Sequence, residues 1–222
     1  MRRFLGALCM LLGLALLAGA AWLLMENRAE ETAAGDAAGE IMSEMRVAMG
    51  DALTATAVAT PTVEIDPENT PAPVETVVAQ ATPIPDMPTM EIDGETYIGY
   101  LEMPTIGLTL PVMRDWSYPQ LRIAPCRYWG SVYDDTMVIM AHNYDRHFGR
   151  IATLELGDPV QFVCADGEIF SYVVCGHETL KPTDVELMLE GTSDLTLFTC
   201  TYGGKSRCAL RCRLIDSVPA QG

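Results

Sequence analysis

The sequence of 222 residues is poor in basic residues and lacks several common site motifs. Fourteen Lys and Arg against thirty Asp and Glu give a formal charge of −16, and the absence of a basic block argues against a nucleic-acid partner. There is no CxxC, no HExxH and no glycine-rich phosphate loop, which disfavours zinc-protease, nucleotide and nicotinamide functions. Seven irregularly spaced cysteines are too few for a disulfide-stapled mini-protein.

The N-terminal segment combines two arginines with a long apolar run. The arginines precede about 22 uncharged, mostly apolar residues from Phe4 to Met25, and in a helix such a run spans a hydrocarbon core of roughly 30 Å. A cleaved signal peptide is the alternative, because "LAGAAW" offers small residues, but the apolar run continues past them. We therefore predict an uncleaved single-pass anchor over residues 4–25 in a cell membrane, with residues 1–3 cytoplasmic and the remainder extracellular.

Residues 26–90 differ in composition from the rest of the chain. They hold twelve acidic and two basic residues, and seven of the fourteen prolines lie between Pro61 and Pro88. Such a segment buries too little apolar area to offset its chain entropy, so we predict a disordered, extracellular acidic linker rich in proline. Its first part, "AEETAAGDAAGEIMSEMRVAM", is rich in Ala and Glu and is compatible with a helix near the membrane.

From about residue 91 the sequence consists of short β-type runs separated by turns. The runs are "YIGYLEM", "LTLPVM", "TMVIMAHN", "PVQFVCA", "EIFSYVVCG", "DLTLFTC" and "SRCALRCRLI". Seven strands in about 125 residues indicate an all-β domain, either a barrel or a sandwich. Only "KPTDVELMLEG" is typical of a short helix.

Three cysteines near the C-terminus have different surroundings. Cys208 and Cys212 lie at i and i+4 of one predicted strand, so their Cα atoms are about 13 Å apart and cannot share a zinc ion. Both fall on the apolar side of that strand and are predicted to be small core residues. Cys200 ends its strand on the side away from Leu197, where a nucleophile would be accessible, although an inert buried cysteine is the alternative.

A cysteine nucleophile needs a neighbouring base or cation, because its thiol is mostly protonated at neutral pH. Three histidines are available: His142 at the end of a strand, His147 in the next loop and His177 after another strand. Arg207 opens the final strand beyond a connection with two glycines, so a hairpin would place its guanidinium beside Cys200 to stabilise an oxyanion.

These segments together resemble the sortases, cysteine transpeptidases that attach proteins to the Gram-positive cell wall. "TLFTC" fits the family's TLxTC signature, "VIMAHNY" resembles its histidine strand, and "RCALRCRL" resembles the segment that begins with its arginine. The opening strand "YIGYLEMPTIGLTLPVM" resembles the start of the sortase barrel. The resemblance covers about residues 96–215.

The resemblance implies an eight-stranded β-barrel with one or two short helices over residues 91–217, a thiol-dependent catalytic domain that follows the anchor and linker. It also implies His142, Cys200 and Arg207 as the catalytic residues, although Arg211 and Arg213 lie on the same predicted strand face as Arg207. The implied substrates are secreted proteins that carry an LPxTG-like C-terminal sorting signal, and the implied acceptor is an amine of a peptidoglycan precursor. We expect no cofactor and no metal.

Two other hypotheses for the function are considered. Papain-like hydrolases also use Cys and His, but they carry the cysteine at a helix N-terminus early in the domain, whereas Cys200 ends a late strand. A membrane-tethered β-barrel that binds a cell-wall polymer without catalysis is the second, and it would not depend chemically on Cys200.

Overall fold

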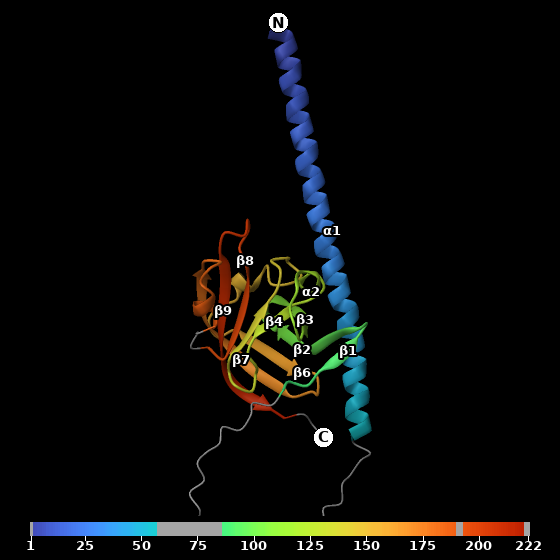
Figure 1. Cartoon of the computed structure of the whole chain (residues 1–222), viewed down its shortest axis with the longest axis vertical. Coiled ribbons are helices and arrows are strands. Elements are labelled where there is room, and N and C mark those ends of the chain that lie inside the picture. Colours follow the sequence, from blue (N-terminus) through green and yellow to red (C-terminus); the bar gives the residue numbers. More distant parts are fainter. Residues whose placement is uncertain (1, 57–85, 190–192, 220–222) are drawn as a thin grey trace, which may run out of the picture.

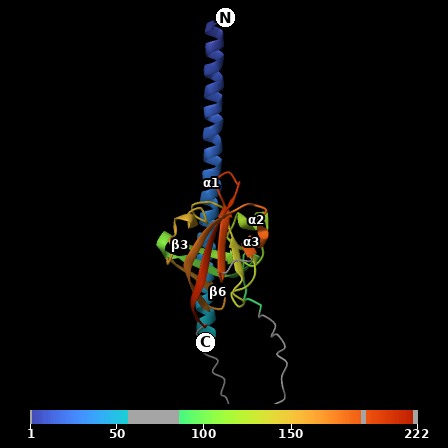
Figure 2. The ribbon, with the colours of Figure 1, turned by 90° about the vertical axis from the view of Figure 1, so that its left-hand side faces the viewer.

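The computed structural model describes residues 2–56, 86–189 and 193–219, which form one long helix and a β-domain (Figure 1). Helix α1 (Arg2–Thr56) extends far beyond the domain at its N-terminal end, and its C-terminal half runs alongside the domain. In the view turned by 90°, the helix lies behind the strands, so it covers one side of the domain (Figure 2).

The strands of the described residues form one sheet, and eight of them close into a ring. From β2 the ring passes through β3, β4, β5, β8, β9, β7 and β6 and returns to β2, while β1 pairs with β2 outside the ring. Neighbours are antiparallel except β3–β4 and β5–β8, which are parallel. The expected all-β fold with eight strands is confirmed, and we refer to the ring as the barrel. Its strands, with β1, are β1 (Met90–Ile92), β2 (Glu95–Met103), β3 (Leu108–Met113), β4 (Cys126–Trp129), β5 (Met137–Met140), β6 (Pro159–Cys164), β7 (Ile169–Leu180), β8 (Leu195–Cys200) and β9 (Arg207–Val218).

Short helical segments connect the strands. Helix α2 (Tyr118–Leu121) precedes β4, and its N-cap Ser117 accepts a hydrogen bond from the backbone N–H of Gln120. Helix α3 (Val185–Leu189) lies within the segment predicted to be helical. Two 3₁₀ turns, η1 (Pro104–Ile106) and η2 (Ile151–Thr153), complete the connections.

All seven strands predicted from the sequence are present, and two further strands were missed. Strand β4 has only four residues, "CRYW", whose arginine and lack of alternation give no β-type pattern. Strand β1 has three residues and lies on the edge of β2. Strands this short carry too few side chains for a periodic signal, and β4 also lacks the continuous apolar run that marks β5.

The central strands are covered on both faces, which explains their nearly continuous apolar sequences. Ile139 of β5 and Leu197 of β8 belong to the main core cluster within the barrel. Their neighbours Val138 and Phe198 belong to a second cluster on the outer face, which includes Met188 of α3. Helix α3 therefore provides the outer cover for this pair of strands.

Helix α1 packs on the barrel through a stripe of small and apolar side chains. The stripe follows helical spacing, which places its members on one face of the helix. Ile92 and Tyr97, from the β1–β2 hairpin, are among its partners in a third buried cluster. The buried members of the stripe are Ala34, Ala38, Ile41, Met42, Met45 and Met49.

The segment 26–56 therefore differs from the solvated linker expected there. It is helical, as its Ala and Glu content allowed, but it is bound to the domain rather than extended in solvent. The linker prediction averaged charge over the whole segment and so overlooked the apolar stripe, which alternates with exposed acidic residues such as Glu40 and Glu44. Met87 is also buried, so residues just before 91 contribute to the domain core. Residues 57–85, with most of the predicted linker, lie outside the described residues.

Met45→Ala is expected to lower the free energy of unfolding by about 2–5 kcal/mol, because it removes a fully buried side chain. The matched control on the same helix is Val47→Ala: Val47 is 64% exposed, so its loss should change stability by no more than about 0.5 kcal/mol. Denaturant unfolding of the full chain in detergent measures both values. Equal small changes would show that α1 does not pack on the barrel in solution.

Candidate active site

The parallel pairing of β5 with β8 brings His142 and Cys200 to the same end of the barrel. The register pairs Met140 with Phe198, and the backbone N–H of Ala141 donates to the carbonyl of Phe198 at 3.2 Å. Cys200 is the last residue of β8, and His142 follows β5 by two residues. Because parallel strands end at the same edge, the two side chains occupy neighbouring positions on one rim.

Three residues of "TLFTC" have distinct structural roles. The hydroxyl of Thr199 donates to the carbonyl of Ala141 at 2.8 Å, which fixes the end of β8 beside the residue that precedes His142. Leu197 packs in the barrel core, and the Phe198 ring meets Tyr128 edge to face with ring centroids 5.4 Å apart. The signature thus contains the contacts that align Cys200 with the histidine strand.

Arg207 lies directly opposite Cys200 in the β8–β9 hairpin. The connecting loop is closed by hydrogen bonds between Thr201 and Ser206, including one of 2.9 Å between their hydroxyls. The Arg207 Nη1 donates to the carbonyls of Gly204 and Ser206, both at 3.3 Å. These bonds hold the guanidinium at the base of the loop, on the same rim as Cys200.

A cleft of about 230 Å³ joins the three predicted residues. His142, Cys200 and Arg207 all line it, and each side chain is partly exposed. Its other walls are mainly apolar and aromatic and come from the α2 and α3 regions and β4, among them Trp116, Tyr118, Tyr128, Val185 and Met188. Such a cleft combines the three candidate catalytic residues with apolar surface of the kind that lines ligand sites.

The other two histidines lie elsewhere. His177 is exposed on β7, where it pairs with Leu210. His147 is fully buried, and its two ring nitrogens have no side-chain hydrogen-bond partner among the described residues. Burial, together with the nearby charge of His142, lowers the pKa of His147 to about 4, so its ring is neutral at physiological pH. Of the three histidines, only His142 lines the cleft.

The surroundings of His142 favour its neutral form. Burial lowers the pKa of His142, the positive charge of Arg122 lowers it further, and the carboxylate of Glu30 on α1 acts in the opposite direction. The Tyr144 ring stacks on the imidazole with centroids 4.9 Å apart and an interplanar angle of 29°. The Tyr144 hydroxyl in turn hydrogen-bonds to Glu30.

Sequence reasoning missed Tyr144, Glu30 and Arg122 as members of this environment. The position of Tyr144 two residues after His142 was visible in the sequence, but nothing in the sequence indicated that it stacks back on the imidazole. Glu30 lies in the segment assigned to the linker, and only the packing of α1 brings it close. Further contacts from α1 reach the same loop: the Glu31 carboxylate accepts from the Asp145 N–H at 2.7 Å, and Asp36 pairs with Arg146 at 2.6 Å.

Arg211, which sequence reasoning placed on the same face as Arg207, has a structural position instead. Its side chain is buried, with Nη2 2.7 Å from a Glu178 carboxylate oxygen and Nη1 2.9 Å from the Thr196 hydroxyl. It also donates to the carbonyls of Leu187 and Met188 in α3. Ala209 and Arg211 lie on the outer face of β9, opposite Leu210 and Cys212 as the alternation predicted, but both are buried because α3 covers that face. Arg213 is exposed and lies outside the cleft.

Three other cysteines of the domain, Cys126, Cys164 and Cys212, are buried, whereas Cys175 and Cys208 are half-buried like Cys200. Cys212 is fully buried, and Cys208 packs partly against the main core, as the apolar-face pattern predicted. Burial raises the pKa of both thiols, and it raises the pKa of Cys126 and Cys164 to about 12. Within the described part of the chain, no group of three or more His, Cys, Asp or Glu side chains is arranged to hold a metal ion.

Comparison with known proteins identifies the family. Residues 101–215, just over half of the chain, match the sortase domain, and the chain therefore belongs to the sortase family. Sortase A from Corynebacterium diphtheriae has a similar fold, with 22% identity, a TM-score of 0.50, and coverage of 57% of this chain and 64% of that chain. Sortase C1 from Streptococcus agalactiae gives 26% identity, a TM-score of 0.50, and coverage of 57% and 71%. The match spans less than two thirds of the sortase A chain, and a comparison with curated proteins gave no match.

Arg122→Gln is expected to raise the pKa of His142, because it removes a positive charge that disfavours the imidazolium. Titration of the His142 ring protons by NMR, assigned with a His142→Asn variant, measures the shift. Arg114→Gln is the control, since Arg114 is exposed and pairs with Asp115. An unchanged or lower pKa in Arg122→Gln would contradict the electrostatic assignment.

Arg211→Ala is expected to lower the free energy of unfolding by about 2–4 kcal/mol, because it leaves the Thr196 hydroxyl and two α3 carbonyls without their donor. Glu178 is 45% exposed and can be hydrated, so its lost ion pair contributes little to this value. Arg213→Ala, an exposed change on the same strand, should stay within about 0.5 kcal/mol. Thermal and denaturant unfolding of both variants checks the difference, and similar stabilities would remove the structural role of Arg211.

Proposed function

We propose that this chain is a membrane-anchored cysteine transpeptidase of a Gram-positive cell surface. It cleaves a C-terminal, LPxTG-like sorting signal of a secreted protein and joins the new carboxyl end to an amine of a peptidoglycan precursor. The observation that carries the proposal is the convergence of Cys200, His142 and Arg207 on one cleft. A nucleophile, an acid–base group and a fixed cation are the groups that acyl transfer requires.

In the first step, the Cys200 thiolate attacks the carbonyl carbon before the scissile bond. The negative charge that develops on the carbonyl oxygen lies within reach of Arg207, whose guanidinium is permanently charged and is oriented by two backbone carbonyls. His142 as imidazolium gives its proton to the departing amine, and a thioacyl-enzyme remains. The lowered pKa of His142 makes its imidazolium a stronger acid for this transfer.

In the second step, the acceptor amine attacks the thioester carbonyl. The now neutral His142 takes the proton that the amine loses, the new amide forms, and the Cys200 thiolate leaves with its electron pair. The enzyme returns to its starting protonation state, so the two steps balance. Water in place of the amine would give hydrolysis of the thioacyl-enzyme.

The N-terminal half of α1 supports the proposed localisation. Within the described residues, α1 is the one helix long and apolar enough to cross a membrane, and it is a candidate anchor. Arg2 and Arg3 before the apolar run favour a cytoplasmic N-terminus, which places the barrel outside the cell. This position would bring the cleft to secreted substrates and to wall precursors.

A non-catalytic barrel that binds a wall polymer is distinguished by the chemistry of Cys200. A peptide vinyl sulfone should label the protein once, and the label should be absent in Cys200→Ala but present in Cys208→Ala. A fluorogenic peptide library, incubated with and without an amine acceptor, then identifies the motif and separates transfer from hydrolysis. Equal labelling of the native chain and Cys200→Ala would exclude the proposed nucleophile.

Arg207→Lys and Arg207→Ala are both expected to lower the transpeptidation rate by about 10²–10³, because lysine keeps the charge but not the planar fork of donors. Cys200 should remain reactive toward a thiol-specific alkylating agent in both variants, while protection of the buried Cys212 from the same agent shows that the barrel is folded. Arg213→Ala, exposed on the same strand, is the control and should keep its rate. Normal turnover by Arg207→Ala would remove Arg207 from the mechanism.

A further inference from the structure

The catalytic end of the barrel faces the apolar half of α1. The loop that follows His142 contacts α1 at its earliest packed residues, through the Glu31–Asp145 hydrogen bond and the Asp36–Arg146 pair. The β1–β2 hairpin contacts α1 further along, where Ile41 to Met49 pack. Along α1, the loop after His142 is contacted first and the β1–β2 hairpin later. The cleft therefore lies at the end of the barrel that is nearer to the apolar run of α1.

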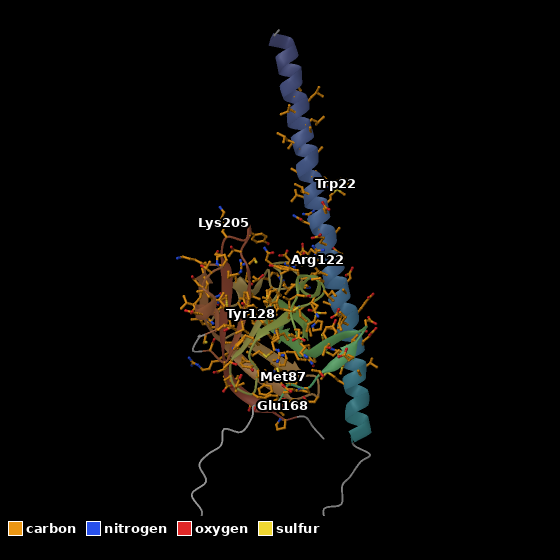
Figure 3. The ribbon with its side chains drawn as sticks, viewed as in Figure 1. Trp22, Met87, Arg122, Tyr128, Glu168 and Lys205 are labelled. Carbon is orange, nitrogen blue, oxygen red and sulfur yellow. The ribbon has the colours of Figure 1, made fainter. Side chains whose placement is uncertain are left out.

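The figures show the same arrangement for labelled residues. Arg122 and Lys205 lie at the end of the barrel that is nearer to Trp22 of α1, whereas Met87 and Glu168 lie at the opposite end (Figure 3). In both ribbon views, the β8–β9 loop extends from the barrel in the direction of the N-terminus of α1 (Figures 1 and 2).

The separation between the apolar run and the catalytic rim is short. Met25 ends the apolar run, and Glu31, which binds the loop after His142, follows six residues later in the same unbroken helix. At 1.5 Å per residue, these positions are about 9 Å apart along the helix axis. A bilayer that holds residues 4–25 would therefore have its headgroup layer at the level of the cleft, because headgroups extend several Å beyond the hydrocarbon core.

The β8–β9 loop carries side chains suited to that layer. Tyr202 is 80% exposed at the tip, and Lys205 is exposed beside it. Tyr is enriched at membrane interfaces, where its ring and hydroxyl meet apolar and polar surroundings together, and Lys is attracted to anionic headgroups. The chain has a net charge of −16 and only two lysines, and one of them, Lys205, lies at the end of the barrel that faces the anchor.

We propose that α1 is a rigid strut that holds the catalytic rim against the membrane, with the 201–206 loop in contact with phospholipid headgroups. The proposal rests on the membrane anchor of the proposed function. It implies that the cleft takes peptide bonds that lie within roughly 10 Å of the bilayer. The distance between the catalytic rim and the membrane then determines which peptide bonds of a membrane-bound substrate can reach the cleft.

Lipid quenching of a single tryptophan tests the position of the rim. In the full chain with Trp22, Trp116 and Trp129 changed to Phe, Tyr202→Trp reports on the loop and Val218→Trp reports on the far end of the barrel, where Val218 pairs with Ile169. In vesicles of phosphatidylcholine and phosphatidylglycerol with a headgroup spin label, Tyr202→Trp should lose fluorescence and Val218→Trp should keep it. Equal quenching of the two probes, or none at Tyr202→Trp, overturns the proposal.

A helical insertion tests the strut itself. Seven helix-forming residues inserted after Glu26 lengthen α1 by about 10.5 Å. They turn the part of α1 after the insertion by only about 20° relative to the part before it. The barrel should therefore move away from the membrane while its packing on residues 34–49 of α1 stays the same. Quenching of Tyr202→Trp should then be lost. The same seven residues inserted between positions 57 and 85 are the matched control and should leave quenching unchanged. Retained quenching after the α1 insertion overturns the strut.

A separate probe distinguishes this proposal from the anchor on which it rests. A variant that keeps Trp22 alone should be quenched by lipids brominated on their acyl chains if the apolar run is inserted. Quenching at Trp22 without quenching at Tyr202→Trp rejects the strut and leaves the anchor. Absence of both rejects the anchor and the strut together, while labelling of Cys200 by the vinyl sulfone still reports on catalysis independently.

Discussion

The parallel pairing of β5 with β8 is the constraint on which the candidate site depends. Both strands are buried on two faces, and the Thr199 hydroxyl bonded to the Ala141 carbonyl aligns their ends. Because parallel strands end at one edge, a histidine and a cysteine 58 residues apart become neighbours. The antiparallel partner β9 then adds Arg207 opposite Cys200. One strand pair and one hairpin thus assemble all three groups without a contribution from distant loops.

Burial decides which of several identical side chains is available for chemistry. Arg207 and Arg211 lie on one strand, but α3 covers Arg211 and binds it through backbone carbonyls, whereas Arg207 stays in the cleft. Cys212 lies in the core and Cys200 lies on the rim of the same β8–β9 pair. In each case the residue that lines the cleft stands at a strand terminus, because there the neighbouring elements no longer cover the outer face.

Helix α1 connects the candidate anchor to the electrostatics of the site. Its apolar stripe packs on the barrel, and its acidic side chains Glu30 and Glu31 reach the loop that carries His142 and Tyr144. Glu30 opposes the effect of burial on the pKa of His142, so a residue a few positions beyond the apolar run acts on the proposed acid–base group. The contacts of Glu30 and Glu31 with this loop therefore both hold the domain on α1 and influence the protonation of His142.

The sequence alone determined the apolar N-terminal run, the seven main strands and the strand-end positions of Cys200, His142 and Arg207, because these depend on local periodicity and on short motifs. Tertiary structure decided the rest. The closure of the ring through β4, the burial of Arg211 beneath α3 and the stacking of Tyr144 on His142 depend on contacts between segments far apart in the chain. The packing of residues 34–49 on the barrel also depends on tertiary structure: helical spacing gives this segment an apolar stripe, but only the folded barrel supplies the surface that the stripe covers.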